Sequence, residues 1–123
     1  MFFGCKKLTN LIISEKFTTE NVTSMNSMFS GCSALTQIDL SHFSTKSVND
    51  ISLMFFKCKS LTYLDMTNFK GENIEKLENV FSGCVSLYEI KWMQDFKTKD
   101  DAKTTELFSG CSLLKFSSMI IKK

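Results

Sequence analysis

The sequence contains no arginine, only one histidine and no long apolar run. All 15 basic residues are lysines, so the chain lacks the guanidinium group that reads guanine and binds phosphate in a bidentate way. Lysines and acidic residues are interspersed and the net charge is only +2, which is unlike a nucleic-acid-binding surface. We therefore expect no nucleic-acid partner.

Signals for membrane insertion and export are also missing from the sequence. No window approaches the roughly 18 consecutive apolar residues that a membrane-spanning helix needs. The N-terminus has no basic segment followed by an apolar one, so no signal peptide is visible. The 43% hydrophobic and 23% charged residues are typical of a globular chain. We expect a single domain over residues 1–123 and no transmembrane segment.

Patterns for catalysis and metal binding are absent as well. The cysteines stand 26 or 27 residues apart and do not form the CxxC pairs of zinc sites. A cysteine nucleophile needs a histidine base, and His42 stands at a variable polar position that suits a solvent-facing loop. We therefore expect no enzyme activity, no cofactor and no metal site.

The sequence contains, instead, one pattern written five times. Cysteines recur at spacings of 27, 26, 26 and 27 residues, each with a phenylalanine three residues before it and a leucine three residues after it. Repeats of this length predict a stack of similar modules. The units are residues 1–27, 28–53, 54–79 and 80–106, with a partial unit at 107–123.

Each unit combines two apolar periods. Alternating apolar residues, such as Ile38 and Leu40, indicate a short strand. The spacing i, i+3, i+6, i+7 ahead of each cysteine, over 22–29, 48–55 and 74–81, indicates a short helix. A unit this short cannot bury its own apolar side, so neighbouring units must stack.

The ends of the expected helices carry suitable residues. Thr19, Thr45 and Thr98 stand at the N-cap position, and a glycine that suits the left-handed C-cap precedes most of the cysteines. Lys57 replaces that glycine in the third unit, where we expect local strain or a different turn. In the fourth unit Asp101 occupies a column that is apolar elsewhere, which predicts a weak segment.

The predicted fold is therefore an α/β repeat. It is a leucine-rich-repeat-like right-handed solenoid with a short parallel sheet on one face and short helices on the other. A parallel β-helix-like solenoid is the alternative.

The cysteine column admits two explanations. Neighbours in a parallel stack lie about 4.8 Å apart, which is within the range that a disulfide tolerates. The odd count and the flanking phenylalanine and leucine columns favour packing, because free cysteine is among the most buried residue types. We predict no disulfide and a ladder of buried thiols formed by Cys5, Cys32, Cys58, Cys84 and Cys111.

The candidate ligand-binding surface is the outer face of the sheet, because strand residues between the inward ones point outward. Its residues are Gln37, Asp39, Ser41, Tyr63, Asp65, Thr67, Glu89 and Lys91. Tyr63 is the predicted anchor, since it combines an aromatic ring with a polar tip. The alternative is that this face is merely solvated.

The run "MFSGCSALTQIDLSHFSTKSVNDISLMF" resembles the BspA-type leucine-rich repeat, also called the mycoplasma-type 26-residue surface-protein repeat. The usual line of that family is MFxGCxxLxxLDLSxFxTxxVxxMxxMF, and the resemblance covers four units and the partial fifth. It implies a surface or secreted protein that takes part in adhesion and binds a protein or glycan ligand, host extracellular molecules included. It implies no catalytic residues.

Two departures from the family leave alternatives open. Without a visible signal peptide, a cytoplasmic or truncated product is the alternative to a surface location. The chain also shows no polar capping segment, and solenoids normally need one for solubility. The alternative function is therefore structural, with a fragment that associates end to end with other copies.

Overall fold

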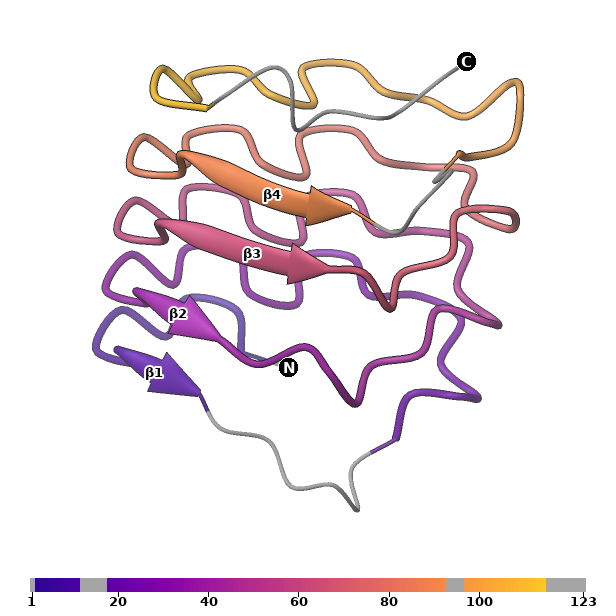
Figure 1. Cartoon of the computed structure of the whole chain (residues 1–123), viewed down its shortest axis with the longest axis horizontal. Coiled ribbons are helices and arrows are strands. Elements are labelled where there is room, and N and C mark those ends of the chain that lie inside the picture. Colours follow the sequence, from indigo (N-terminus) through magenta and orange to yellow (C-terminus); the bar gives the residue numbers. More distant parts are fainter. Residues whose placement is uncertain (1, 12–17, 93–96, 115–123) are drawn as a thin grey trace.

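The computed structural model describes residues 2–11, 18–92 and 97–114. The chain winds in successive coils that lie on one another, and each sequence repeat makes one coil (Figure 1). We number them coils 1 to 5, in the order of the five units. Ile13, which stands in the repeat column of Leu40, and Phe17 and Phe96, which stand in the repeat column of Phe43, lie outside the described residues.

In the part of the chain that the structure describes, four strands lie on one face of the stack (Figure 1). They are β1 (Asn10–Leu11), β2 (Gln37–Ile38), β3 (Tyr63–Met66) and β4 (Glu89–Trp92). β1 pairs in parallel with β2, and β3 with β4, at the offset of the repeat. The strands stand where alternating apolar residues predicted them, but they form two two-stranded sheets and not one continuous sheet.

The helices predicted over 22–29, 48–55 and 74–81 do not form, and the described part of the chain contains no helix. Consecutive four-residue turns take their place. The Met28 N–H donates to the Met25 carbonyl at 3.2 Å, and the Cys32 N–H donates to the Phe29 carbonyl at 3.1 Å. The third residue of each turn, Ser27 or Gly31, has a positive φ, as in a type II turn.

Most of the remaining N–H groups of these segments donate to the next coil, and a few, such as that of Asn49, donate to the preceding one. The Phe29 N–H donates to the Met54 carbonyl at 2.9 Å, and the Phe55 N–H donates to the Val80 carbonyl at 2.9 Å. Parallel bridges run through the same segments at Ser24, Asp50, Lys76 and Lys103. A backbone ladder between coils therefore replaces the internal hydrogen bonds of a helix.

Ladders of identical side chains fill the interior. The rings of Phe2, Phe29, Phe55, Phe81 and Phe108 stack with successive centroid separations of 5.4, 5.5, 5.9 and 5.6 Å. The cysteine and leucine columns run beside them and are buried in coils 2 to 5. Apolar burial between neighbouring coils is the main driving force that this arrangement offers.

Two of the three threonines expected as helix N-caps, Thr19 and Thr45, join coils to each other, whereas the Thr98 hydroxyl donates to the neighbouring Lys99 carbonyl at 3.3 Å. The Thr45 hydroxyl donates to the Lys70 carbonyl at 2.8 Å and accepts from the Lys70 N–H at 2.7 Å. The Thr19 hydroxyl makes the same pair of bonds with Ser44. Because these hydroxyls are buried and make two bonds each, they act as clamps between successive coils.

In coil 4 the residue that fills the apolar column is not Asp101, as the repeat alignment predicted, but its neighbour Ala102. Asp101 is exposed, and Ala102 enters the core in its place through a turn in which the Ala102 N–H donates to the Lys99 carbonyl at 3.1 Å. Burying an unpaired carboxylate is costly, and a shift of one residue avoids that cost. Lys57, by contrast, keeps the shape of the glycine turn with a φ of 57°.

Candidate functional site

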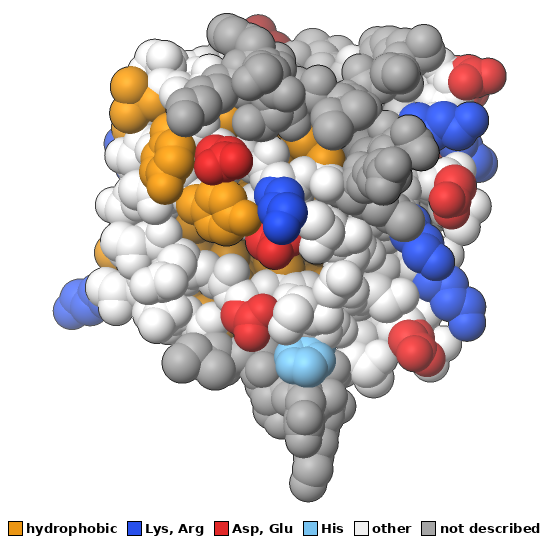
Figure 2. Space-filling model, in the orientation of Figure 1, with side chains coloured by type: hydrophobic (Ala, Val, Ile, Leu, Met, Phe, Trp, Pro, Cys, Tyr) orange, Lys and Arg blue, Asp and Glu red, His pale blue; other side chains and the backbone are white. Residues whose placement is uncertain are grey.

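The predicted ligand-binding residues lie on and beside the outer face of the strands. Most of their side chains are exposed, namely Gln37, Asp39, Ser41, Tyr63, Asp65 and Lys91, whereas Thr67 and Glu89 are half-buried. Hydrophobic side chains gather on this face beside acidic and lysine side chains (Figure 2). The face therefore offers apolar, anionic and cationic groups within one surface.

β3 and β4 bring four of these residues together. Tyr63 is the register partner of Glu89, and Asp65 is the register partner of Lys91. Partial burial raises the pKa of the Tyr63 hydroxyl, and the negative charges of Asp65 and Glu89 raise it further. Tyr63, with 36% of its surface exposed, therefore remains a neutral hydrogen-bonding group on an apolar ring.

Asp39 and Asp65 are exposed, and their carboxylates also stabilise the backbone by accepting hydrogen bonds. Oδ1 of Asp39 accepts from the Ser41 N–H at 2.9 Å, and Oδ1 of Asp65 accepts from the Thr67 N–H at 3.0 Å. Hydrogen bonds to the Ser41 and Thr67 side chains are the first cause of a lowered pKa in both carboxyls. Each carboxylate thus closes a turn after its strand.

Sequence reasoning missed two apolar residues on the edge of this surface. Tyr88 is 43% exposed and precedes β4, and Val85 is 46% exposed in the turn before it. The signal was present in the repeat, because Tyr88 stands in a column that holds threonine at Thr9, Thr36 and Thr62. An aromatic residue at a position that is otherwise polar and exposed marks a surface feature, since the core cannot account for it.

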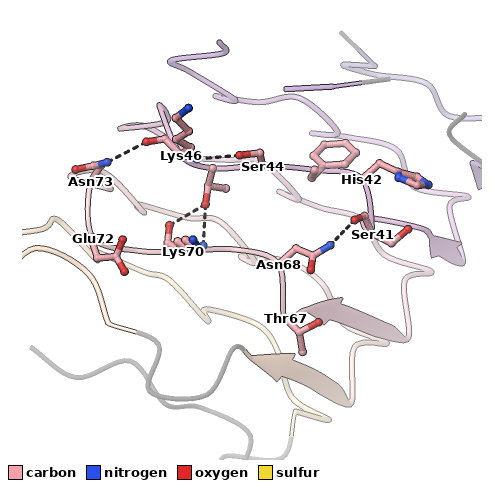
Figure 3. A pocket seen from close by; sticks show the side chains of 11 residues that line it. Ser41, His42, Ser44, Lys46, Thr67, Asn68, Lys70, Glu72 and Asn73 are labelled. Atoms are coloured by element: carbon pink, nitrogen blue, oxygen red, sulfur yellow. Dashed lines mark hydrogen bonds between the residues drawn. The ribbon is translucent and has the colours of Figure 1, made fainter. Parts of the chain in front are cut away.

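A groove of about 600 Å³ lies between coils 2 and 3 and is shown in Figure 3. It lies beside the sheet face, where the two coils leave their strands. Its lining consists of Ser41, His42, Phe43, Ser44, Thr45, Lys46, Thr67, Asn68, Lys70, Glu72 and Asn73. Only Ser41 and Thr67 belong to the predicted face.

Side chains join the two coils across this groove (Figure 3). The Asn68 amide donates to the Ser41 carbonyl, and the Asn73 amide donates to the Lys46 carbonyl at 2.9 Å. The Thr45 clamp lies between these two contacts. No repeat column predicted the groove, because it depends on how far the coils separate.

The five cysteines are free thiols in the interior column. Each of the last four donates a hydrogen bond to a phenylalanine carbonyl of the preceding coil, as Cys58 does to Phe29 at 3.2 Å. Burial raises the pKa of Cys58 to about 12 and also raises the pKa of Cys84. A neutral thiol is a poor nucleophile, and the four cysteines of coils 2 to 5 contribute apolar packing to the interior. Cys5, in coil 1, is half-buried.

Among the described residues, no three histidine, cysteine or acidic side chains come together as a metal site. The same part of the chain contains no helix that is long and apolar enough to cross a bilayer. The aromatic and charged side chains of β3 and β4 and the polar side chains of the groove are the groups that this surface offers for non-covalent contacts.

A protein-family model matches residues 1–120 of the chain, and its description is "Mycoplasma protein of unknown function, DUF285". A search of curated proteins found no match. A search of solved structures also found none.

Proposed function

The chain belongs to this DUF285 family of unknown function, and we propose that it is a non-catalytic binding module. The coils form a fixed scaffold, and the outer face of β3 and β4 binds an extended segment of a protein partner. In this proposal the repeat is of the BspA type, and the module works in adhesion at a cell surface.

The proposal rests on one observation. Aromatic side chains are exposed on a scaffold that buries its repeated apolar columns. Tyr63 and Tyr88 are 36% and 43% exposed, while the phenylalanine ladder is fully buried in coils 2 to 4. Tyrosine is enriched among the residues that dominate binding energy at protein interfaces. Asp65, Glu89 and Lys91 surround this pair with charges that would set the orientation of a partner.

We further propose that the stack is a solenoid of the parallel β-helix type. The backbone ladder on the turn side and the parallel strands on the opposite side favour this architecture over a leucine-rich repeat with helices. Such stacks present an extended surface on which several coils contribute to one partner.

A pull-down against a panel of host extracellular proteins tests the function. We expect the chain to capture a protein, and Tyr63→Ala combined with Asp65→Asn to reduce the capture at least about tenfold, as loss of an interface anchor does. Asparagine retains the oxygen that accepts from Thr67, so the turn is kept. Phe3→Ala combined with Glu20→Ala changes an exposed aromatic and an acid elsewhere and should have no effect. No capture, or equal loss in both variants, rejects the proposal.

The polarity of the ladder favours end-to-end association as a second candidate function. On the turn side, N–H groups such as that of Phe29 donate to the following coil, and on the strand side groups such as the Thr36 N–H donate to the preceding coil, so two copies stacked in the same direction would continue both sets of bonds. Size-exclusion chromatography with light scattering should then give a mass that rises with concentration. A monomer at every concentration rejects this second candidate.

A further inference from the structure

We propose that the groove between coils 2 and 3 is a second binding site and that its ligand is a short oligosaccharide. The groove lies on the edge of the stack and not on the strand face, and it calls for a different class of ligand. It is therefore independent of the protein-binding function proposed for Tyr63 and Tyr88.

The groove exists because the two coils are held apart at this edge. The Phe43 and Phe69 rings beneath it have a centroid separation of 6.4 Å, wider than the largest step of the main phenylalanine ladder, which is 5.9 Å. Side chains of asparagine and threonine bridge the space, and backbone hydrogen bonds do not. A hollow of about 600 Å³ falls within the range of ligand pockets in proteins, so it is large enough for more than ordered water.

The bridging bonds determine which atoms remain for a ligand. The Asn68 and Asn73 amide nitrogens are used by the carbonyls of Ser41 and Lys46, so each carboxamide oxygen remains as an acceptor. The same bonds fix both side chains in place before a ligand arrives. Preorganised polar groups lower the entropic cost of binding.

The remaining lining supplies both donors and acceptors. Lys46 and Lys70 carry ammonium donors. Glu72 carries a carboxylate acceptor, and His42 an imidazole that can do either. Within the described ranges, the one ion pair joins Lys99 to Glu75, so Lys70 and Glu72 are not paired with each other. The floor is apolar at Phe43, which is only 3% exposed.

This combination fits a sugar better than other small ligands. Lys46 and Lys70 would attract a phosphate-rich ligand, but the Glu72 carboxylate in the same lining opposes it. An apolar ligand would leave the amide and charged groups desolvated without partners. A pyranose carries adjacent hydroxyls that both donate and accept, which matches a lining that supplies both donors and acceptors.

An NMR titration of the intact ¹⁵N-labelled chain tests the site with maltotriose, which is neutral, and with trigalacturonate, which is acidic. We expect saturable shifts in the amides of 41–46 and 67–73 at millimolar concentrations. Shifts with both sugars indicate recognition of hydroxyl groups, and shifts with trigalacturonate alone indicate an acidic sugar. No shift with either sugar, or equal shifts with citrate, overturns the proposal.

Variants separate the groove from the sheet face. Lys70→Ala and Glu72→Ala each remove a lining group that takes no part in the side-chain bridges, and each should weaken binding of the shifting sugar about fivefold or more, the value of one lost hydrogen bond. Lys59→Ala changes an exposed lysine outside the groove and should leave the affinity unchanged. Tyr63→Ala should also leave it unchanged, so failure of either proposal is distinguishable from failure of the other. An unchanged affinity in both groove variants contradicts the assignment.

Discussion

Lys57 occupies a backbone conformation that the other coils give to glycine. Its φ is 57°, and Gly31 and Gly83 at the equivalent positions have φ values of 77° and 81°. A side chain in this left-handed region clashes with its own backbone, which costs about 1–2 kcal/mol. The sequence predicted local strain or a different turn at Lys57, and the structure shows that the turn has the same shape as the glycine turns of the other coils.

Lys57→Gly should therefore stabilise the protein by about 1 kcal/mol, after loss of the weak contact between the Lys57 ammonium and the Phe56 ring. Urea unfolding measures the change. Lys59→Gly, two residues away and exposed, is the control and should be neutral or destabilising. Equal effects of the two substitutions would show that the turn carries no strain.

Cys58 should make the protein less stable as the pH rises in the alkaline range. Its pKa rises from about 9 to about 12 on folding because burial disfavours the thiolate. Below pH 9 the thiol is protonated in both states, so the full stability is present. Between pH 9 and 12 only the unfolded chain ionises, so the free energy of unfolding falls by about 1.4 kcal/mol per pH unit for this thiol.

Urea titrations at successive pH values from 9 to 12 test this dependence. Lysines and tyrosines also titrate there, so the informative quantity is the difference between the wild type and Cys58→Ala. The variant should lose stability less steeply as the pH rises. The same slope in both proteins would mean that the Cys58 thiol is accessible to ionisation in the folded state.

At the scale of elements, stacked turns took the place of predicted helices. Inward residues of successive four-residue turns recur at every third or fourth position, which is also the apolar period of a helix. The repeat period, the core columns and the strand positions could be read from the sequence, because identical residues recur at fixed spacing. The turn path could not be read, since it depends on hydrogen bonds between residues about 25 positions apart, such as Phe29 and Met54.

The two candidate binding surfaces also differ in whether they could be predicted from the sequence. Tyr63 and Asp65 follow from strand alternation, so their outward position was predictable. The groove depends on the spacing between coils, which no residue pattern encodes. The burial of Ala102 instead of Asp101 was unpredictable for a related reason. The path of the backbone decides which of two adjacent residues points into the core, and the residue pattern does not specify that path.

The phenylalanine ladder should be the most sensitive element. Phe55 is fully buried and stacks on Phe29 and Phe81 in the coils on either side. Phe55→Ala should cost about 3–5 kcal/mol, since it removes a large side chain and leaves a cavity. Phe3→Ala, at a site that is 70% exposed, should change stability by less than about 0.5 kcal/mol. Thermal unfolding followed by circular dichroism compares them, and a small loss at Phe55 would contradict the ladder.

The threonine clamp gives a second prediction for the elements. Thr45→Val keeps the shape of the side chain but removes both bonds to Lys70, which should cost about 1–3 kcal/mol. Thr36→Val removes a single bond to the Thr9 carbonyl at an exposed site and should cost less. Urea unfolding of the two variants tests the ranking. If Thr36→Val cost more stability than Thr45→Val, the two bonds between Thr45 and Lys70 would not contribute to holding the coils together.

At the scale of the whole molecule, the coils depend on one another for stability. Each coil supplies hydrogen-bond partners and ring contacts to its neighbours, so a single repeat lacks most of the contacts that stabilise it. This scaffold leaves the strand face and the groove edge free to differ from coil to coil. The columns that repeat build the stack, and the positions that vary, such as Tyr63 and Tyr88, supply the candidate binding groups.

Consecutive repeats form hydrogen-bonded coils, and scalar couplings across those hydrogen bonds can detect this arrangement in solution. In a ¹⁵N,¹³C-labelled sample, the Phe29 amide nitrogen should couple to the carbonyl carbon of Met54, and the Phe55 nitrogen to that of Val80. A helix would couple the Phe29 nitrogen to the Met25 carbonyl carbon, four residues earlier. Couplings to the following coil are the result that the account predicts, and couplings within the segment would contradict it.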